Sequence, residues 1–183
     1  MSSNNARGYF EVLIRRGGVE SSQFVRSLET MALGDELAFK GGRYRLNYLG
    51  QDDPISAMTI VTSGLGVAPT LQMLRGILTD RDSTVEDVDL LWINESKGDF
   101  VCEEDVEALE LRHIEKVVVT RVIEDDIYGR DLLKNERIED AVSPYEEGRV
   151  AVICAPDYIT STLRTLFQDL GYPPESILSV TIN

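Results

Sequence analysis

The stretch IVTSGLGVAPTLQMLRGIL, Ile60 to Leu78, decides how the rest of the chain is interpreted. A β-branched run leads into a glycine-rich turn, and the turn leads into an amphipathic run. That order is typical of a strand followed by a helix whose first amides can hold a phosphate. Gly64 and Gly66 permit a tight turn and close approach to a ligand, and Pro69 falls where a missing N–H costs a helix nothing.

The glycine pattern by itself leaves two interpretations open. The third glycine of a GxGxxG motif is absent, and no Lys-Ser/Thr of a P-loop follows. The stretch therefore fits a nucleotide-binding turn and a plain strand-to-helix turn equally well.

From Pro54 onward, strand-like and helix-like segments alternate. The pattern predicts strands at 58–61, 88–93, 117–122, 150–154 and 177–182, and helices at 68–78, 103–112, 132–141 and 158–170. Alternation of this kind favours parallel strands joined by right-handed crossovers. We therefore expect an α/β fold with a five-stranded parallel nucleotide-binding sheet over residues 54–183.

The first 53 residues have a different pattern. Strand-like runs at 9–14, 36–39 and 44–49 surround a helical segment at 22–31. The sequence GQDDPIS, Gly50 to Ser56, is the expected boundary. Residues 1–53 therefore read as a separate, partial β segment.

Charge and composition exclude several classes of protein. The 183 residues carry a net charge of −14, and such a surface repels nucleic acid. No apolar run reaches the length of a membrane span, so we expect no transmembrane segment. With two cysteines and no secretory-type segment at the start, we expect an intracellular, reducing compartment, cytoplasm or organelle interior.

Four motifs in a fixed order carry a resemblance. They are a GVESS turn at 18–22, SGLGVAPTLQ at 63–72, LLWINE at 90–95 and CAPD at 154–157. In this order and spacing the chain resembles the ferredoxin–NADP reductase superfamily, most closely NADH-cytochrome b5 reductases and the flavin–NAD modules of nitrate reductases. The resemblance implies a flavin domain, a partial β-barrel here, followed by an NAD(P)-binding domain.

The resemblance also implies site residues. Cys154 would touch the nicotinamide near the hydride path, although a small buried apolar residue is the other interpretation. Ser21 and Ser22 would face the flavin phosphate. The dinucleotide would be held by Ser63, Gly64, Leu65, Gly66, Val67, Ala68, Pro69, Asn94, Arg121, Ala155 and Pro156.

Three further residues, Arg121, His113 and Cys102, have structural interpretations that need no ligand. Arg121 would either read a 2′-phosphate, as its counterpart does in NADPH-using relatives, or pair with Glu124 or Asp125. His113 is expected at a helix C-terminus on the surface rather than on a metal. Cys102 opens an acidic helix and is expected to be structural.

Several departures from the family pattern affect the expected function. The family's R-x-Y-S/T flavin motif is absent, Leu65 stands for a threonine, and Ala155 stands for a glycine. We expect a flavin-dependent NAD(P)H oxidoreductase-type electron-transfer module, incomplete as a single chain, that passes electrons to a haem or iron–sulfur carrier. FAD would bind only if the missing strands are supplied, and a protein partner would cover the N-terminal β segment. The alternative is a non-catalytic accessory subunit of a larger assembly, such as a respiratory or photosynthetic one.

Overall fold

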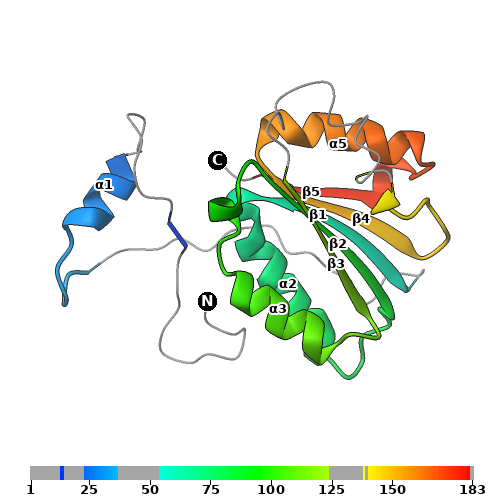
Figure 1. Ribbon diagram of the computed structural model, residues 1–183, viewed down its shortest axis with the longest axis horizontal. Helices are drawn as coiled ribbons and strands as arrows, with labels where there is room; N and C mark the ends of the chain where they lie inside the picture. The colour runs from blue at the N-terminus through cyan, green and yellow to red at the C-terminus, as the bar shows by residue number, and fades with distance from the viewer. Residues whose placement is uncertain (1–12, 15–22, 37–53, 124–137, 139, 182–183) are drawn as a thin grey trace.

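The computed structural model describes residues 13–14, 23–36, 54–123, 138 and 140–181 (Figure 1). After α1 (Gln23–Thr30), strands and helices alternate along the chain. Their order is β1 (Ala57–Ser63), α2 (Val67–Thr79), β2 (Asp87–Asn94), α3 (Glu103–Arg112), β3 (Val117–Ile123), β4 (Arg149–Ala155), α5 (Asp157–Asp169) and β5 (Ile177–Thr181). Short 3₁₀ turns lie at Gly64–Gly66, Lys97–Asp99 and Pro174–Ser176.

The strands form one parallel sheet in the order β3-β2-β1-β4-β5. This confirms the predicted α/β fold with a five-stranded parallel sheet. The chain moves outward from β1 to β3, returns to pair β4 with the other side of β1, and ends at β5. Since the direction reverses between β1 and β4, the carboxyl ends of these two strands form the topological switch point, where sheets of this kind bind ligands.

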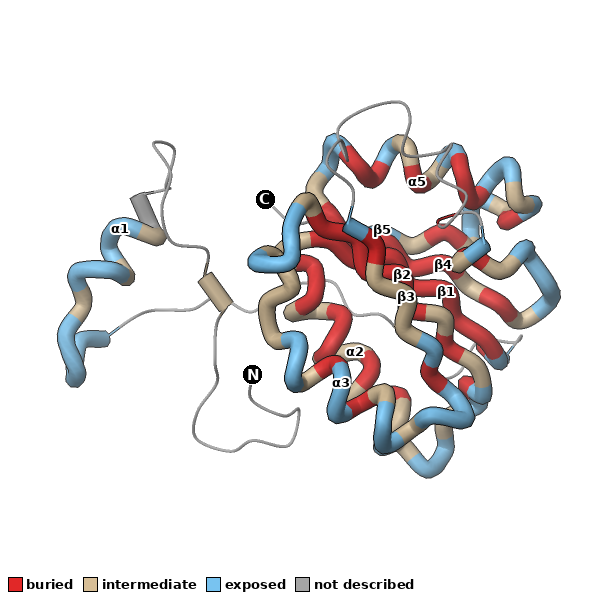
Figure 2. Tube along the Cα trace, in the orientation of Figure 1, coloured by how far each residue is buried: buried red, intermediate tan, exposed pale blue. Residues whose placement is uncertain are grey.

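Helices cover both faces of the sheet. Figures 1 and 2 show α2 and α3 against one face and α5 against the other, with the buried residues between them. All seven residues of β1 are buried, because a central parallel strand is covered on both sides. Its side chains alternate, so that Met58 and Ile60 pack with Leu71 under α2, while Val61 packs with Leu163 under α5.

The expected element bounds agree with the structure to within a residue or two. The helix predicted at 132–141 lies mainly outside the described residues, although Ile138 is buried in the core beneath α5. Among the described helices, none combines the length and the apolar character needed to cross a bilayer.

Little of the N-terminal region is described. The helix expected at 22–31 is confirmed as α1, which lies apart from the sheet in Figure 1. Leu13 packs against the core beneath α2 and α3. The three expected strands lie outside the described residues almost entirely, so the partial β-barrel and the domain boundary remain predictions.

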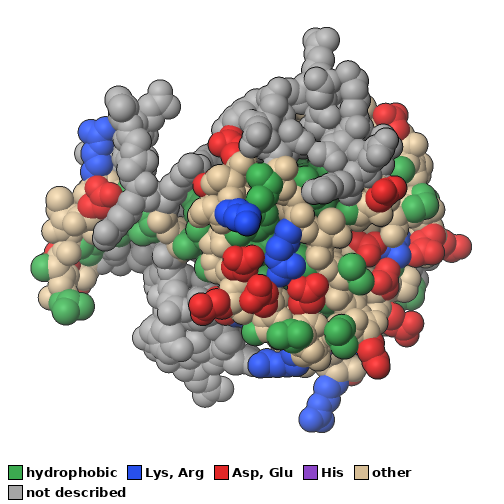
Figure 3. Space-filling model, in the orientation of Figure 1, with side chains coloured by type: hydrophobic (Ala, Val, Ile, Leu, Met, Phe, Trp, Pro, Cys, Tyr) green, Lys and Arg blue, Asp and Glu red, His purple; other side chains and the backbone are tan. Residues whose placement is uncertain are grey.

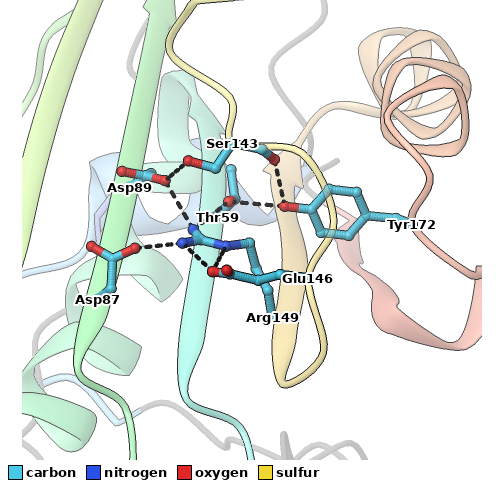
Figure 4. A network of polar contacts seen from close by, with 7 residues as sticks. All are labelled: Thr59, Asp87, Asp89, Ser143, Glu146, Arg149 and Tyr172. Carbon is cyan, nitrogen blue, oxygen red and sulfur yellow. Dashed lines mark hydrogen bonds and ion pairs between the residues drawn. The ribbon is translucent and has the colours of Figure 1, made fainter.

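A buried arginine joins strands at the amino end of the sheet (Figure 4). Arg149 opens β4 and is 6% exposed. Its guanidinium contacts Asp87 at 2.6 Å and Asp89 at 2.9 Å on β2, and Glu146 at 2.8 Å in the preceding loop. Burial lowers the pKa of Arg149, but the hydrogen bonds to Asp87 and Glu146 and the nearby carboxylate charges raise it further, so the net shift is upward. The side chain therefore stays charged and needs these carboxylates.

Tyr172, in the loop that follows α5, completes this network from the core beneath that helix. Its hydroxyl donates to the carbonyl of Ser143 at 2.8 Å and lies 3.1 Å from Oγ1 of Thr59. The Ser143 hydroxyl in turn donates to Asp89 at 2.7 Å. The network thus fixes β1, β2 and β4 at the end opposite the switch point and leaves the carboxyl end for a site.

Candidate functional site

The second glycine of the turn after β1 is required by the packing of β4. A Cβ atom on Gly66 would lie 1.7 Å from the carbonyl oxygen of Cys154 and 2.6 Å from its carbonyl carbon. Thr70 donates from its hydroxyl to the Gly66 carbonyl at 2.9 Å, which closes the first turn of α2. Gly66 must therefore be glycine because the turn packs directly against the backbone of β4, whether or not a ligand is bound.

The first glycine has the opposite surroundings. Gly64 has φ of 54°, in the left-handed region that favours glycine, and a Cβ there would meet no atom within 4 Å. It lies beside the start of α2, which no described side chain caps. A helix N-terminus next to open space offers its amides and its dipole to an anion.

The other predicted residues of the turn lie around this space. Ser63 and Val67 are buried, while Leu65, Ala68 and Pro69 are half-buried. The structure therefore places Ser63 to Pro69 at the switch point, and their contact with a dinucleotide stays a prediction.

Asn94, at the end of β2, is tied to the turn. Its Oδ1 accepts a hydrogen bond of 2.8 Å from the Gly64 amide. The residue is 2% exposed, yet its Nδ2 has no hydrogen-bond partner among the described residues. Because a buried donor without an acceptor is costly, this amide indicates a partner that the described residues do not supply.

The next residue was not among the predicted site residues. Oε1 of Glu95 is also buried without a hydrogen-bond partner among the described residues. The signal that identifies Glu95 in a sequence is its place: an acidic residue directly after the second strand of a dinucleotide-type fold.

Cys154 lies differently from the expected thiol facing the cleft. It is 1% exposed and belongs to the core beneath α2 and α3, because it shares its face of β4 with Val150 and Val152. Burial raises the pKa of the Cys154 thiol, and a hydrogen bond with Thr70 offsets part of that rise. In this conformation the buried-residue interpretation fits the thiol, and its catalytic role stays a prediction.

Ala155 and Pro156 follow at the same switch point. Ala155 ends β4 and is fully buried, and Pro156 is half-buried directly before α5. They therefore border the turn of Ser63 to Pro69 from the β4 side, and their contact with a cofactor stays a prediction.

Arg121 on β3 is paired with α3. Its guanidinium donates to Oε2 of Glu110 from both terminal nitrogens, at 3.3 and 3.2 Å, and its Nε lies 3.7 Å from Oε1 of Glu103. Figure 3 shows basic and acidic side chains mixed on this face of the molecule. The partners expected from the sequence, Glu124 and Asp125, lie outside the described residues.

The remaining predicted residues lie away from this site or outside the description. Ser21 and Ser22 are not among the described residues. His113 follows the last residue of α3, as predicted for a helix C-terminus, and Cys102 precedes its first residue with φ of 60°. In the described part of the chain, no cluster of three or more His, Cys, Asp or Glu side chains is arranged to hold a metal.

Comparisons with known proteins agree with this geometry. The family described as the oxidoreductase NAD-binding domain matches residues 60–164, more than half of the chain. Nitrate reductase (NADPH) of Aspergillus niger is 26% identical over 193 residues, covering 94% of this chain and 22% of that protein. NADH-cytochrome b5 reductase 1 of Laccaria bicolor is 23% identical over 184 residues, covering 98% of this chain and 58% of that protein.

A solved structure has the same fold. The cytochrome b5 reductase domain of Ulva prolifera nitrate reductase superposes with a TM-score of 0.72 at 18% identity, covering 88% of this chain and 65% of that chain. The chain spans about a fifth of the nitrate reductases and less than two thirds of the cytochrome b5 reductases that it matches. Given the sheet order, the glycine turn at the switch point and the matched residues, the chain belongs to the oxidoreductase NAD-binding domain family.

Proposed function

We propose that the chain is the NAD(P)H-binding part of a flavin-dependent oxidoreductase that passes electrons to a haem or iron–sulfur carrier. One arrangement carries the proposal: Gly64, where a Cβ atom would meet open space, lies just before α2 and is hydrogen-bonded to Asn94, whose buried Nδ2 has no partner among the described residues. A dinucleotide phosphate is an anion with many acceptor oxygens, so it suits both groups. The cytochrome b5 reductases and nitrate reductases among the relatives support the reaction class.

The dinucleotide would lie across two short segments at the switch point. Gly64 to Ala68 would hold the pyrophosphate, because α2 begins there and Gly64 leaves room for it. Cys154 to Asp157, at the end of β4, would border the nicotinamide half. In this arrangement the buried Cys154 shapes the wall of the site through its backbone, which also contacts the turn at Gly66.

The flavin part of the proposal rests on the resemblance to the reductases. A bound flavin would take up a hydride and release its electrons singly. The residues expected at its phosphate, Ser21 and Ser22, lie outside the described residues. A protein partner that covers the N-terminal β segment is part of the same proposal.

A charge placed at the start of α2 tests nucleotide binding without harming the fold. Ala68 is half-buried in the first turn of α2, so Ala68→Glu adds a carboxylate that the helix dipole favours but that a pyrophosphate repels. Thr79→Glu is the matched control, because it adds the same charge to an exposed position about 17 Å along the same helix.

Calorimetric titration with NAD⁺ measures the outcome. We expect Ala68→Glu to weaken binding at least about tenfold, since the added charge would lie beside the phosphates, while Thr79→Glu binds like the unchanged chain. Equal affinity of all three proteins for NAD⁺ would show that the phosphates do not bind at the turn. Absence of NAD⁺ binding by the unchanged chain would refute the nucleotide site.

A second candidate function is binding without catalysis, as in an accessory subunit. The burial of the Cys154 thiol favours it, because a thiol at 1% exposure is not available to a nicotinamide. The visible absorption spectrum of the purified protein, followed by NADH-dependent reduction of ferricyanide, separates the two. Bound flavin with turnover supports the oxidoreductase, and NAD⁺ binding with neither supports the accessory role.

A further inference from the structure

The backbone at the end of β4 is held by the hydroxyls of buried threonines. Thr62, the residue of β1 that pairs in register with Cys154, donates to the Cys154 carbonyl at 3.3 Å. Thr160 on α5 donates to the carbonyl of Ala155 at 3.3 Å and to that of Pro156 at 3.0 Å. Three successive carbonyls therefore accept hydrogen bonds from side chains of two other elements, which leaves this segment little freedom to shift.

The glycine turn after β1 is attached to the same segment. A Cβ atom on Gly66 would lie 1.7 Å from the Cys154 carbonyl oxygen and 3.0 Å from Oγ1 of Thr62, so Gly66 lies directly against the hydrogen bond between these two residues. Thr70 on α2 donates to the Gly66 carbonyl at 2.9 Å, and its hydroxyl is also hydrogen-bonded with the Cys154 thiol. The turn and the end of β4 are thus joined by two buried threonine hydroxyls and one direct backbone contact.

The Thr62 hydroxyl lies where the core itself needs no polar group. Thr62 shares its face of β1 with Met58 and Ile60, which pack with Leu71 under α2. Burial of a hydroxyl among apolar side chains is costly unless it makes a hydrogen bond, whereas a valine of the same shape would pack there without that cost. The Thr62 hydroxyl therefore serves to fix the Cys154 carbonyl rather than to fill the core.

In the proposed site, the turn holds the pyrophosphate and the end of β4 borders the nicotinamide half. A ligand that spans two segments binds more tightly when their separation is already set, because less ordering has to accompany binding. We propose that Thr62 and Thr70 are positioning residues that hold the glycine turn and the end of β4 at the separation that a dinucleotide needs. The inference rests on the proposed function and adds to it two residues that are not among those predicted for the site.

Three double variants separate the hydroxyls from the shape of the side chains. Thr62→Val/Thr70→Val removes both hydroxyls and keeps the shape, whereas Thr62→Ser/Thr70→Ser keeps both hydroxyls. Thr79→Val/Thr165→Val is the matched control, because these exposed threonines also donate to the carbonyl four residues earlier, as Thr70 does, but lie away from the turn and from β4. Thermal melts identify the variants that are folded.

Two ligands distinguish positioning from a general loss of structure. Each protein is titrated calorimetrically with ADP and with NADH. ADP carries the pyrophosphate and can occupy the turn, but it lacks the nicotinamide half that would border β4. A variant whose site is merely damaged should lose affinity for both ligands alike, whereas a variant with a wrong separation should lose affinity for NADH alone.

We expect the unchanged chain to bind NADH more tightly than ADP, and the control and serine variants to keep the ratio of the two affinities. Thr62→Val/Thr70→Val should weaken NADH binding about five- to tenfold, since a loosened segment must be ordered when the ligand binds, and should leave ADP binding unchanged. Thr62→Val alone should show a smaller change in the same direction, and it replaces the double variant if that variant does not fold.

Three results would overturn the inference while leaving a nucleotide at the turn. They are equal weakening of NADH and ADP in the valine variants, unaltered NADH affinity in those variants, and binding of NADH by the unchanged chain that is no tighter than binding of ADP. Loss of the NADH preference in the serine variant as well would show that the methyl groups, not the hydroxyls, matter. If the folded, unchanged chain binds neither ligand, the proposed function fails and the positioning role fails with it.

Discussion

A Cβ atom on Gly66 would lie 1.7 Å from the carbonyl oxygen of Cys154, whereas a Cβ atom on Gly64 would lie in open space. Two glycines separated by one residue therefore serve different purposes. Gly66 lets the turn after β1 pass directly against the end of β4. Gly64 supplies a left-handed backbone conformation beside the start of α2. Only Gly64 has room for a ligand next to it.

This difference predicts unequal effects of the same substitution. Gly66→Ala should destabilise the chain by more than about 3 kcal/mol or prevent folding, because the methyl group meets backbone that cannot move aside. Gly64→Ala should cost only about 1–2 kcal/mol, the strain of a left-handed alanine. Urea unfolding of both variants measures the difference. Similar losses at the two positions would contradict the assigned packing.

The hydrogen bond between Gly64 and Asn94 should stabilise the folded chain. Asn94→Ala removes the acceptor of the Gly64 amide in a partly buried turn, which should cost about 1–2 kcal/mol. Ser96→Ala is the control, since it removes only an exposed hydroxyl that donates to Asp99. A free energy of unfolding unchanged in Asn94→Ala would show that the turn does not depend on this bond.

The two cysteines should differ in reactivity. Burial raises the pKa of the Cys154 thiol, so little reactive thiolate forms near pH 8, and the side chain is 1% exposed. In Cys102→Ala, we expect Ellman's reagent to label the remaining thiol only after unfolding, whereas Cys154→Ala should react in the native state through the half-buried Cys102. Rapid native labelling of Cys102→Ala would place the Cys154 thiol at an open cleft, as the family resemblance implies.

Arg149 should contribute strongly to stability at the opposite end of the sheet. Arg149→Met leaves Asp89 half-buried and Asp87 beside it without their cation, and we expect a loss of about 2–4 kcal/mol. The figure lies below that of a fully buried pair, because Asp87 and Glu146 are 48% and 61% exposed. Arg164→Met on α5, which removes one hydrogen bond to Ser179, is the control and should lose less than about 1 kcal/mol in the same urea titration.

The raised pKa of Tyr172 predicts that the free energy of unfolding depends on pH in the alkaline range. Burial raises the pKa of its hydroxyl, hydrogen bonding to Thr59 and the charge of Arg149 lower it, and Asp89 and Glu146 raise it, with a net upward shift. The folded state therefore prefers the neutral hydroxyl. Its contribution is complete below the ordinary tyrosine pKa of about 10 and is lost as pH rises through the folded-state pKa.

Unfolding free energies of the unchanged chain and Tyr172→Phe between neutral and alkaline pH test this. Tyr172→Phe should be less stable by about 1 kcal/mol at neutral pH, where it lacks the hydrogen bonds to Ser143 and Thr59. Above about pH 10 the two curves should converge. Parallel curves would mean that Tyr172 does not titrate differently in the folded state.

Much of the fold was predictable because buried strands and amphipathic helices each require a characteristic spacing of apolar residues in the sequence. The run Met58 to Val61 is apolar without alternation, which indicates a strand covered on both faces, and β1 is such a strand. The spacing of Leu71, Leu74 and Ile77 predicted the buried face of α2, and all three residues lie in one core. The predicted N-terminal strands lie almost entirely outside the described residues and stay untested.

The candidate site was predictable only where a motif marked it. Ser63 to Pro69, Asn94, Ala155 and Pro156 come together at the switch point, because the ends of adjacent parallel strands share one edge. Glu95 closes the LLWINE motif, but nothing in the motif shows that its carboxylate oxygen is unpaired, and the Glu103 and Glu110 partners of Arg121 belong to no motif. They depend on which side chains of separate elements meet.

The sequence by itself determined the alternation of strands and helices, the parallel sheet and the position of the glycine turn, since these follow from local periodicity and backbone freedom. The tertiary structure alone decided which glycine has room for a ligand, which face of β4 buries Cys154 and which carboxylates hold Arg121. The physical reason is that these properties depend on distances between atoms far apart in the chain, which packing of β1, β4 and α3 sets and which no local pattern of residues records.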